Sequence, residues 1–143
     1  MAEYYPPVGF HFKVEFTNLN GEYQFQSVSG LTVNLETEEI AEGGENRFKH
    51  KLPVKTSYPN LVLKRGLLVN SDLIKWCREA VEDFIIKPTD ITISLLNEKH
   101  EPLMTWSIVH AYPVKWATAD FNAEENKLAI ETIELVYNYF RIQ

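Results

Sequence analysis

The chain has 143 residues, 45% of them hydrophobic and 13% aromatic, which is enough for one domain, residues 1–143, with a single hydrophobic core. Its formal net charge of −6 gives an acidic surface and disfavours binding to the phosphate backbone of a nucleic acid. The first residues lack the basic stretch and apolar run of a signal peptide, and no apolar run approaches the length of a membrane span. We therefore expect a soluble chain that is made in the cytoplasm and has no stable association with a membrane.

The first part of the chain has the alternating pattern of β-strands with one buried face. Residues 10–16 alternate apolar and polar side chains, and residues 22–28 resume the alternation after Asn20-Gly21, a pair that favours a tight reversal. A third strand is predicted over residues 31–36, so that the first forty residues would form an antiparallel meander. The polar faces of these strands would make a broad hydrophilic surface, formed by Gln24, Gln26, Thr32, Asn34 and Glu36.

Residues 41–60 interrupt this alternation with two glycines and two prolines, and only a short strand near residues 48–52 is predicted there. The glycines and prolines argue against a long regular element. A connection of this length inside a compact domain is usually functional or disordered. Its lysines, with Lys64 and Arg65 beyond them, make a weak nucleic-acid footprint. Because they follow an acidic stretch, they fit better as one half of a charge-complementary contact between subunits.

One substantial helix is predicted, over residues 72–84. Ser71 is a suitable N-cap, Asp72 is favourable in the first turn, and Pro88 prevents continuation. The apolar residues at helical spacing are Leu73, Ile74, Cys77, Ala80, Val81 and Phe84. We expect this face to pack on the strands, so that Phe84→Ala would cost about 3–5 kcal/mol.

The rest of the chain returns to strands. Residues 89–96 and 103–110 are predicted to pair as a hairpin around a turn at residues 97–101, and residues 128–140 alternate again. The last strand would place Ile133, Leu135, Tyr137 and Tyr139 on one face. The predicted fold class is therefore mainly β, a β-barrel or sandwich of two antiparallel sheets with one flanking α-helix.

No residue of the chain is a strong candidate for catalysis, metal binding or cofactor binding. The four histidines lack the short spacings of metal-binding helices or knuckles, and His100 and His110 would lie about 20 Å apart along the predicted hairpin. Cys77 lies on the apolar side of the predicted helix, where a small buried hydrophobe is the better interpretation than a thiolate nucleophile. Nucleophile-elbow and phosphate-loop motifs are absent from the sequence.

Several short segments, taken in order, resemble the tail-tube (inner tube) protein family of contractile phage tails and contractile injection systems. The match covers nearly everything from Phe10 to Tyr139, and the family's usual Gly after Leu-Pro is replaced here by Val54. The segments are Phe10–Val14, Ser27–Leu31, Glu42–Asn46, Leu61–Gly66, the single residue Trp106, Ala111–Lys115 and Ala123–Thr132.

The resemblance implies a structural protein and not an enzyme, without a cofactor. Copies of the chain would form hexameric rings, and the rings would stack into a hollow inner tube that a contracting sheath drives through a target membrane. The implied partners are the chain itself, the sheath protein, baseplate or spike and terminator proteins, and a cargo effector or DNA in the lumen. A type VI secretion tube component and a baseplate-proximal tube initiator remain alternatives. A small β-barrel enzyme or ligand-binding domain is the rival from another class.

Within this interpretation, two sets of residues are candidates for assembly. The segment 41–59 is expected to join one ring to the next, through the contact candidates Glu42, Glu45, Arg47, Lys49, Lys51 and Lys55. The polar strand faces are expected to line the lumen, since a wet polar wall offers little apolar surface to a moving cargo. These lumen-lining candidates are Gln24, Gln26, Thr32, Asn34 and Glu36.

Overall fold

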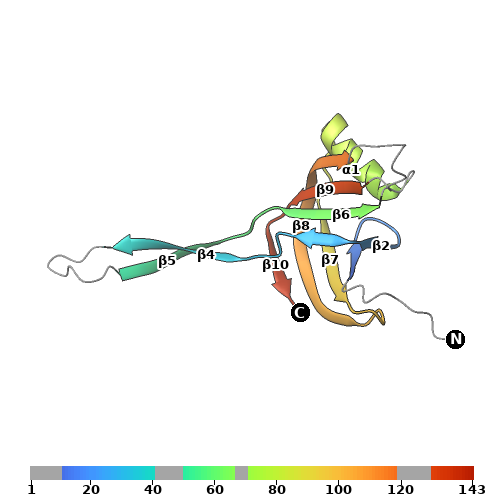
Figure 1. The fold of residues 1–143 in the computed structure, drawn as a ribbon. Coiled ribbons are helices and arrows are strands. Elements are labelled where there is room, and N and C mark those ends of the chain that lie inside the picture. The colour runs from blue at the N-terminus through green and yellow to red at the C-terminus, as the bar shows by residue number, and fades with distance from the viewer. Residues whose placement is uncertain (1–10, 41–49, 67–70, 119–129) are drawn as a thin grey trace, which may run out of the picture.

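The computed structural model describes residues 11–40, 50–66, 71–118 and 130–143, and these residues form ten strands and one helix (Figure 1). The elements are β1 His11–Phe16, β2 Glu22–Phe25, β3 Ser27–Ser29, β4 Asn34–Ile40, β5 His50–Ser57, β6 Leu61–Gly66, α1 Asp72–Asp83, β7 Thr89–Leu96, β8 Pro102–Thr118, β9 Ile130–Val136 and β10 Tyr139–Ile142. Eight strands form the body, in the order β2-β1-β7-β8-β9-β6-β3, with β10 paired to β8. The remaining two, β4 and β5, form a separate two-stranded sheet that we call the arm.

The body is a barrel-like pair of antiparallel sheets that share strands. Strand β8 is 17 residues long; its first part pairs with β7 and β10, and its last part pairs with β9. On the opposite side, β2 pairs with β1 while β3, directly after it, pairs with β6. At the switch between them, the Gln26 N–H donates to the Lys64 carbonyl oxygen at 2.9 Å. The mainly-β fold class with one flanking helix is therefore confirmed.

The alternation in the sequence produces the core, because successive side chains of a strand point to opposite faces. In β7 the buried residues recur at every second position through Ile93, and β1 contributes Val14 and Phe16. The hydrophobic residues that the structure buries together are Val14, Phe16, Phe25, Leu61, Leu63, Leu73, Trp76, Cys77, Ile91, Ile93, Trp106, Ile108, Ala111, Ile133, Leu135, Tyr137 and Phe140. Two of the predicted hairpins, β1–β2 and β7–β8, are confirmed.

Helix α1 lies at one end of the body and begins as predicted, with the Ser71 Oγ accepting a hydrogen bond from the Ile74 N–H at 3.1 Å. Its buried face consists of Leu73, Trp76, Cys77 and Ala80. The prediction that Phe84 packs in the core is wrong, because 84% of this residue is exposed. Phe84 follows the last helical turn in a left-handed conformation, φ 57°, and Val81 is exposed as well. Within the described residues, no helix is long and apolar enough to cross a membrane.

Three predictions about the strands are wrong in part. The first forty residues do not form a meander, because β3 pairs with β6 and the chain then leaves the body as β4. The strand predicted near residues 48–52 is longer, since β5 has eight residues and includes Pro53. Both strands of a two-stranded sheet are edge strands. Every second N–H of such a strand points away from its partner, and a proline can be accommodated at those positions. The last strand breaks at Asn138, which shifts the alternation so that Phe140 is buried in place of Tyr139.

Candidate assembly surfaces

The arm projects away from the body, as Figure 1 shows on its left side. Every side chain of β4 and every side chain of β5 up to Thr56 is exposed. At its base, Gly30 has φ +95°, and a Cβ at this position would collide with the carbonyl oxygen of Asn60. The two chain segments that lead into and out of the arm are thus held together by a close backbone approach. A two-stranded hairpin alone in water is marginally stable, so the arm is a candidate for contact with another chain.

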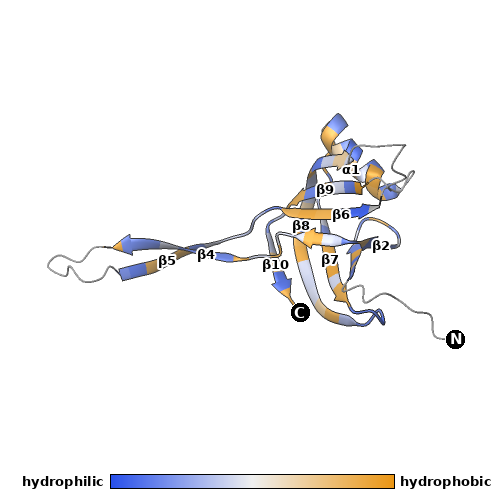
Figure 2. Ribbon diagram, in the orientation of Figure 1, coloured by the Kyte–Doolittle hydropathy of each residue, from blue (hydrophilic) through white to orange (hydrophobic). Residues whose placement is uncertain are grey.

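The surface of the arm combines charge with apolar area. Strand β4 is acidic and β5 is basic, and Lys55 Nζ lies 3.6 Å from Glu36 Oε2 across the two strands. Glu39 faces Lys51 in the same ladder. The arm also exposes large apolar side chains. They are Leu35, Ile40, Leu52 and Val54. In Figure 2 the ribbon of the arm is orange at hydrophobic residues and blue at hydrophilic ones.

The structure places the predicted inter-ring residues only in part. Lys51 and Lys55 are exposed on β5, within the arm. The other four candidates lie outside the described residues; they are Glu42, Glu45, Arg47 and Lys49. Complementary charges face each other within one subunit, across β4 and β5 of the arm, whereas the charge contact predicted between subunits stays a prediction.

The five predicted lumen-lining residues do not share one sheet surface. Gln24 in β2 and Gln26 directly after it are exposed on the body. Thr32 is exposed but lies outside any strand, and Asn34 and Glu36 belong to the arm. The single hydrophilic face expected from a meander is therefore divided between the body and the arm.

A second apolar surface lies at the end of α1, and it includes Val81 and Phe84, which the sequence predicts to lie in the core. Val81, Phe84, Ile85 and Ile86 are all exposed, and they lie within six residues of one another in the chain. The Ile85 N–H donates to the Glu79 carbonyl oxygen at 2.9 Å, which closes the helix end. For Phe84, both the left-handed backbone and the exposure of the aromatic ring to water are unfavourable. Exposed apolar surface of this kind commonly marks contact with a partner.

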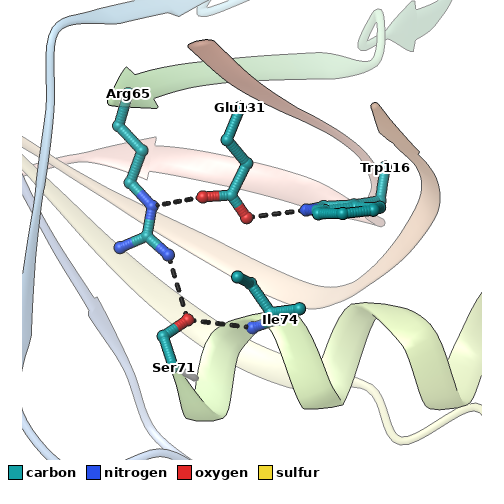
Figure 3. A network of polar contacts seen from close by, with 5 residues as sticks. All are labelled: Arg65, Ser71, Ile74, Trp116 and Glu131. Carbon is teal, nitrogen blue, oxygen red and sulfur yellow. Dashed lines mark hydrogen bonds and ion pairs between the residues drawn. The ribbon is translucent and has the colours of Figure 1, made fainter. Parts of the chain in front are cut away.

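The body contains a buried polar network, shown in Figure 3. Arg65 on β6 is 2% exposed and Glu131 on β9 is 0% exposed, and Arg65 Nε donates to Glu131 Oε2 at 2.8 Å. The other carboxylate oxygen accepts from Trp116 Nε1 at 2.7 Å, and Arg65 Nη2 donates to Ser71 Oγ at 3.1 Å. Because Ser71 also caps α1, the network links the helix to three strands of the body.

The expectation that Arg65 belongs to a surface basic group is wrong, because the residue is buried. The signal was present in the alternation, because Leu61, Leu63 and Arg65 fall on one face of β6, as Glu131, Ile133 and Leu135 do on β9. The Arg65 guanidinium also lies over two aromatic rings, with its Cζ 5.5 Å from the centroid of Tyr23 and 5.3 Å from that of Phe25. These contacts offset part of the cost of removing the cation from water.

Cys77 is fully buried on the inner face of α1. Burial, followed by the negative charge of Glu131, raises the pKa of this thiol from 9.0 to about 12. A thiol with such a pKa is protonated at neutral pH and is a poor nucleophile. The described residues contain no group of three or more His, Cys, Asp or Glu side chains that could hold a metal ion.

Comparison with known proteins agrees with this architecture. The family model of the T4-like virus tail tube protein gp19 matches residues 8–141, and the chain belongs to this family of tail tube proteins. A chain in the cryo-EM structure of the anti-feeding prophage (AFP) baseplate is 32% identical with a TM-score of 0.81, and the match covers 100% of this chain and 97% of that chain. The resemblance to the tail-tube family is thus confirmed.

Two further structures are similar. A chain from the sheath-tube complex of PVC, an extracellular contractile injection system, is 30% identical with a TM-score of 0.77, covering 92% of this chain and 87% of that chain. A type six secretion system protein is 10% identical with a TM-score of 0.68, covering 93% and 82%, and shares the fold alone. No curated protein matches the chain by sequence.

Proposed function

We propose that this tail tube protein is the inner-tube subunit of a contractile injection system, in which hexameric rings stack into a hollow conduit for cargo. Family membership and the two structures at 30–32% identity support this assignment. The type VI secretion alternative is less well supported, because the type six protein is only 10% identical. The role is structural, and no catalytic residue is assigned.

The arm is the observation that carries the proposal. It exposes apolar and charged side chains together, and it makes its regular contacts within its own two strands. Stacking of identical rings is a heterologous contact, which places a given surface of one copy against a different surface of the next and therefore extends without closing. In this arrangement the arm reaches a neighbouring copy, which covers its apolar residues and pairs with its charges.

The wider assembly follows from the two similar particles. Their structures are described as a baseplate and as a sheath-tube complex. By analogy, a sheath would surround the tube of this protein, baseplate or spike and terminator proteins would close its ends, and a cargo effector or DNA would occupy its lumen. The subunit would be made in the cytoplasm and incorporated into the particle.

We assign the lumen to exposed polar residues of the body. Gln24 in β2 and Gln26 directly after it remain the best candidates, and Thr32, which lies outside the strands, is a third. Asn34 and Glu36 are better assigned to the arm, where Glu36 pairs with Lys55. A structure of the assembled tube that placed Gln24 and Gln26 against a neighbouring subunit would contradict this assignment.

A charge swap on the arm tests the proposed function. Lys55→Glu alone puts two carboxylates opposite each other, which weakens the hairpin itself. The double variant Glu36→Lys with Lys55→Glu restores an internal pair but inverts the charges that a neighbour would meet. We expect the double variant to form folded subunits or single rings and few tubes in negative-stain electron microscopy. The control is Lys99→Glu, a charge reversal at an exposed turn of the body.

The outcomes separate the parts of this proposal. Tubes of wild-type length and number from the double variant would show that the arm charges do not set ring stacking. If the wild-type protein forms neither rings nor tubes under any ionic strength tested, the tube-subunit proposal itself fails.

A baseplate-proximal tube initiator is the second candidate, supported by the match to a chain of the AFP baseplate. An initiator provides the first ring and is not required to polymerise with itself. Purified wild-type protein that stops at single rings, at concentrations where other tube proteins polymerise, would favour this candidate.

A further inference from the structure

Two histidines that are distant in the sequence lie side by side at the turn end of β7 and β8. His11 opens β1, and His100 lies in the turn between β7 and β8. His11 Nε2 is 3.0 Å from His100 Nδ1, and the rings are edge to face with centroids 4.8 Å apart. Both rings reach solvent.

The backbone of the body creates this juxtaposition. His11 is paired with Leu96, the last residue of β7, so β1 begins beside the turn between β7 and β8. The turn is itself ordered by Asn97, whose Oδ1 accepts the N–H groups of Lys99 and Glu101 at 2.9 Å each. His100 has φ 63°, and its N–H donates to the Asn97 carbonyl oxygen at 2.9 Å. The position of His100 is therefore set by local hydrogen bonds, independently of His11.

We propose that His11 Nε2 and His100 Nδ1 together bind a divalent first-row transition metal such as Zn²⁺, Ni²⁺ or Cu²⁺. Metal–nitrogen bonds of about 2.0–2.1 Å place two ligand nitrogens roughly 2.9 Å apart at a right angle and about 3.3 Å apart at a tetrahedral angle. The observed separation of 3.0 Å falls between these values.

Binding requires a small rearrangement of protons and rings. In the hydrogen-bonded pair, the N–H of one ring donates a hydrogen bond to the lone pair of the unprotonated nitrogen of the other ring. To bind a metal, the donor ring takes the tautomer with its proton on the opposite nitrogen, and both rings turn so that their lone pairs converge. The two imidazole nitrogens displace two water ligands of the hydrated ion, so one hydrogen bond and two metal–water bonds are replaced by two metal–nitrogen bonds. Because protons compete for the same lone pairs, acidification weakens the binding.

The ligand set defines the class of metal. Imidazole nitrogens suit Zn²⁺, Ni²⁺ and Cu²⁺, whereas Mg²⁺ and Ca²⁺ prefer oxygen ligands. No third His, Cys, Asp or Glu joins the pair among the described residues, so water completes the coordination. The affinity is therefore lower than that of a closed structural zinc site. The bound ion would fasten β1 to the β7–β8 turn and stabilise the folded subunit by linkage.

The experiment uses the full-length protein without a histidine tag, titrated with NiCl₂ in a calorimeter and in thermal unfolding. The variants are His11→Gln, His100→Asn and the double variant; asparagine tolerates the left-handed backbone of His100. His110→Asn is the matched control, because His110 is also exposed and left-handed, with φ 60°. We expect one Ni²⁺ per subunit in the wild type and in His110→Asn, and a loss of affinity of about tenfold or more in each single variant. MgCl₂ should have no effect.

A second measurement needs no variant. Diethyl pyrocarbonate modifies accessible imidazoles, and mass spectrometry of peptides reports the modification at each histidine. Ni²⁺ should protect His11 and His100 and leave His110 unprotected. Unchanged Ni²⁺ binding by the double variant, equal loss in His110→Asn, or absence of protection at His11 and His100 would overturn the proposal. None of these readouts depends on tube assembly, so the site can fail while the tube function stands.

Discussion

The body and the arm are both antiparallel β-structure, but their strands have different surroundings. In the body, β9 alternates half-buried and buried residues along its whole length, and its partners on both sides are other strands. In the arm, no residue of β4 is buried, and β4 pairs only with β5 within the described residues. The comparison shows that backbone pairing alone does not distinguish the two regions; burial of side chains does.

This difference predicts where the free energy of unfolding resides. Burial of apolar area stabilises by roughly 25 cal/mol per Å², so the body contributes most of the stability of an isolated subunit. The arm would become stable only where a neighbouring copy covers its exposed residues. Five substitutions or conditions, from the largest expected effect to the smallest, test this division.

The largest effect is expected in the buried network of the body. Glu131→Gln keeps the shape of the side chain but leaves the Arg65 guanidinium buried without a counter-charge. We expect a loss of about 3–5 kcal/mol, measured by urea unfolding of the subunit. The paired replacement Arg65→Met with Glu131→Leu should cost less, because no charge remains buried. A negligible cost for Glu131→Gln would mean that the pair does not support the body.

The next test compares the buried face of α1 with Phe84, the exposed residue that follows the helix. Trp76 is buried, its ring centroid lies 5.5 Å from that of Phe16, and its Nε1 donates to the Lys87 carbonyl oxygen at 2.9 Å. We expect Trp76→Ala to cost about 3–5 kcal/mol. Phe84→Ala should change the stability of the isolated subunit by no more than about 0.5 kcal/mol, since the side chain is exposed. Equal costs in thermal unfolding would contradict the described end of the helix.

The boundary between the two regions is sensitive to a single methyl group. Gly30→Ala introduces a Cβ against the carbonyl oxygen of Asn60 and requires alanine to adopt φ +95°. We expect a loss of about 2–4 kcal/mol from the strained conformation and the overpacking together. Gly21→Ala is the control, because Gly21 also has a positive φ but has open space around its Cβ position. It should therefore cost less in the same assay.

Alkaline pH should lower the free energy of unfolding of the body, because the buried Cys77 thiol and Tyr137 hydroxyl resist losing their protons in the folded state. The pKa of Cys77 is raised to about 12 and that of Tyr137 also to about 12, in both cases mainly by burial. The folded protein then holds more protons than the unfolded chain above about pH 9, so stability is complete below that pH and is lost as the pH rises through 12. At pH 10.5, the Cys77 thiol alone should lower the free energy of unfolding by about 2 kcal/mol relative to neutral pH. Cys77→Ser should flatten this part of the stability profile, and a slope unchanged by the substitution would exclude the thiol as its source.

The smallest effect is expected on the arm. Leu52→Ser with Val54→Ser removes apolar surface that is already exposed, so the free energy of unfolding of the isolated subunit should change by no more than about 0.5 kcal/mol. Leu63→Ser in the body, where the side chain is fully buried, should cost several times more. A large loss from the arm variant in the isolated subunit would show that the arm belongs to the folding unit of the body.

Local features of the fold could be predicted from the sequence. The helix start at Ser71 and the hairpins β1–β2 and β7–β8 depend on neighbouring residues, whose conformational preferences act over a few positions. The connection from β1 to β2 is longer than the tight turn predicted at Asn20-Gly21, since it spans residues 17–21. The alternation also identified most of the core. The resemblance to the tail-tube family depended on the order of short segments along the chain, and the family match over residues 8–141 confirms it.

Tertiary structure alone decided the rest. Pairing of β3 with β6 and of β4 with β5 joins residues far apart in the chain, and the alternation along a strand does not state which strand lies beside it. For the same reason, the sequence could not show that His11 meets His100. Nor could it show that Phe84 lies past the end of the buried face, because helical periodicity continues beyond the last contact with the body. Local chemistry determined the elements, while their partners depended on which surfaces could be buried together.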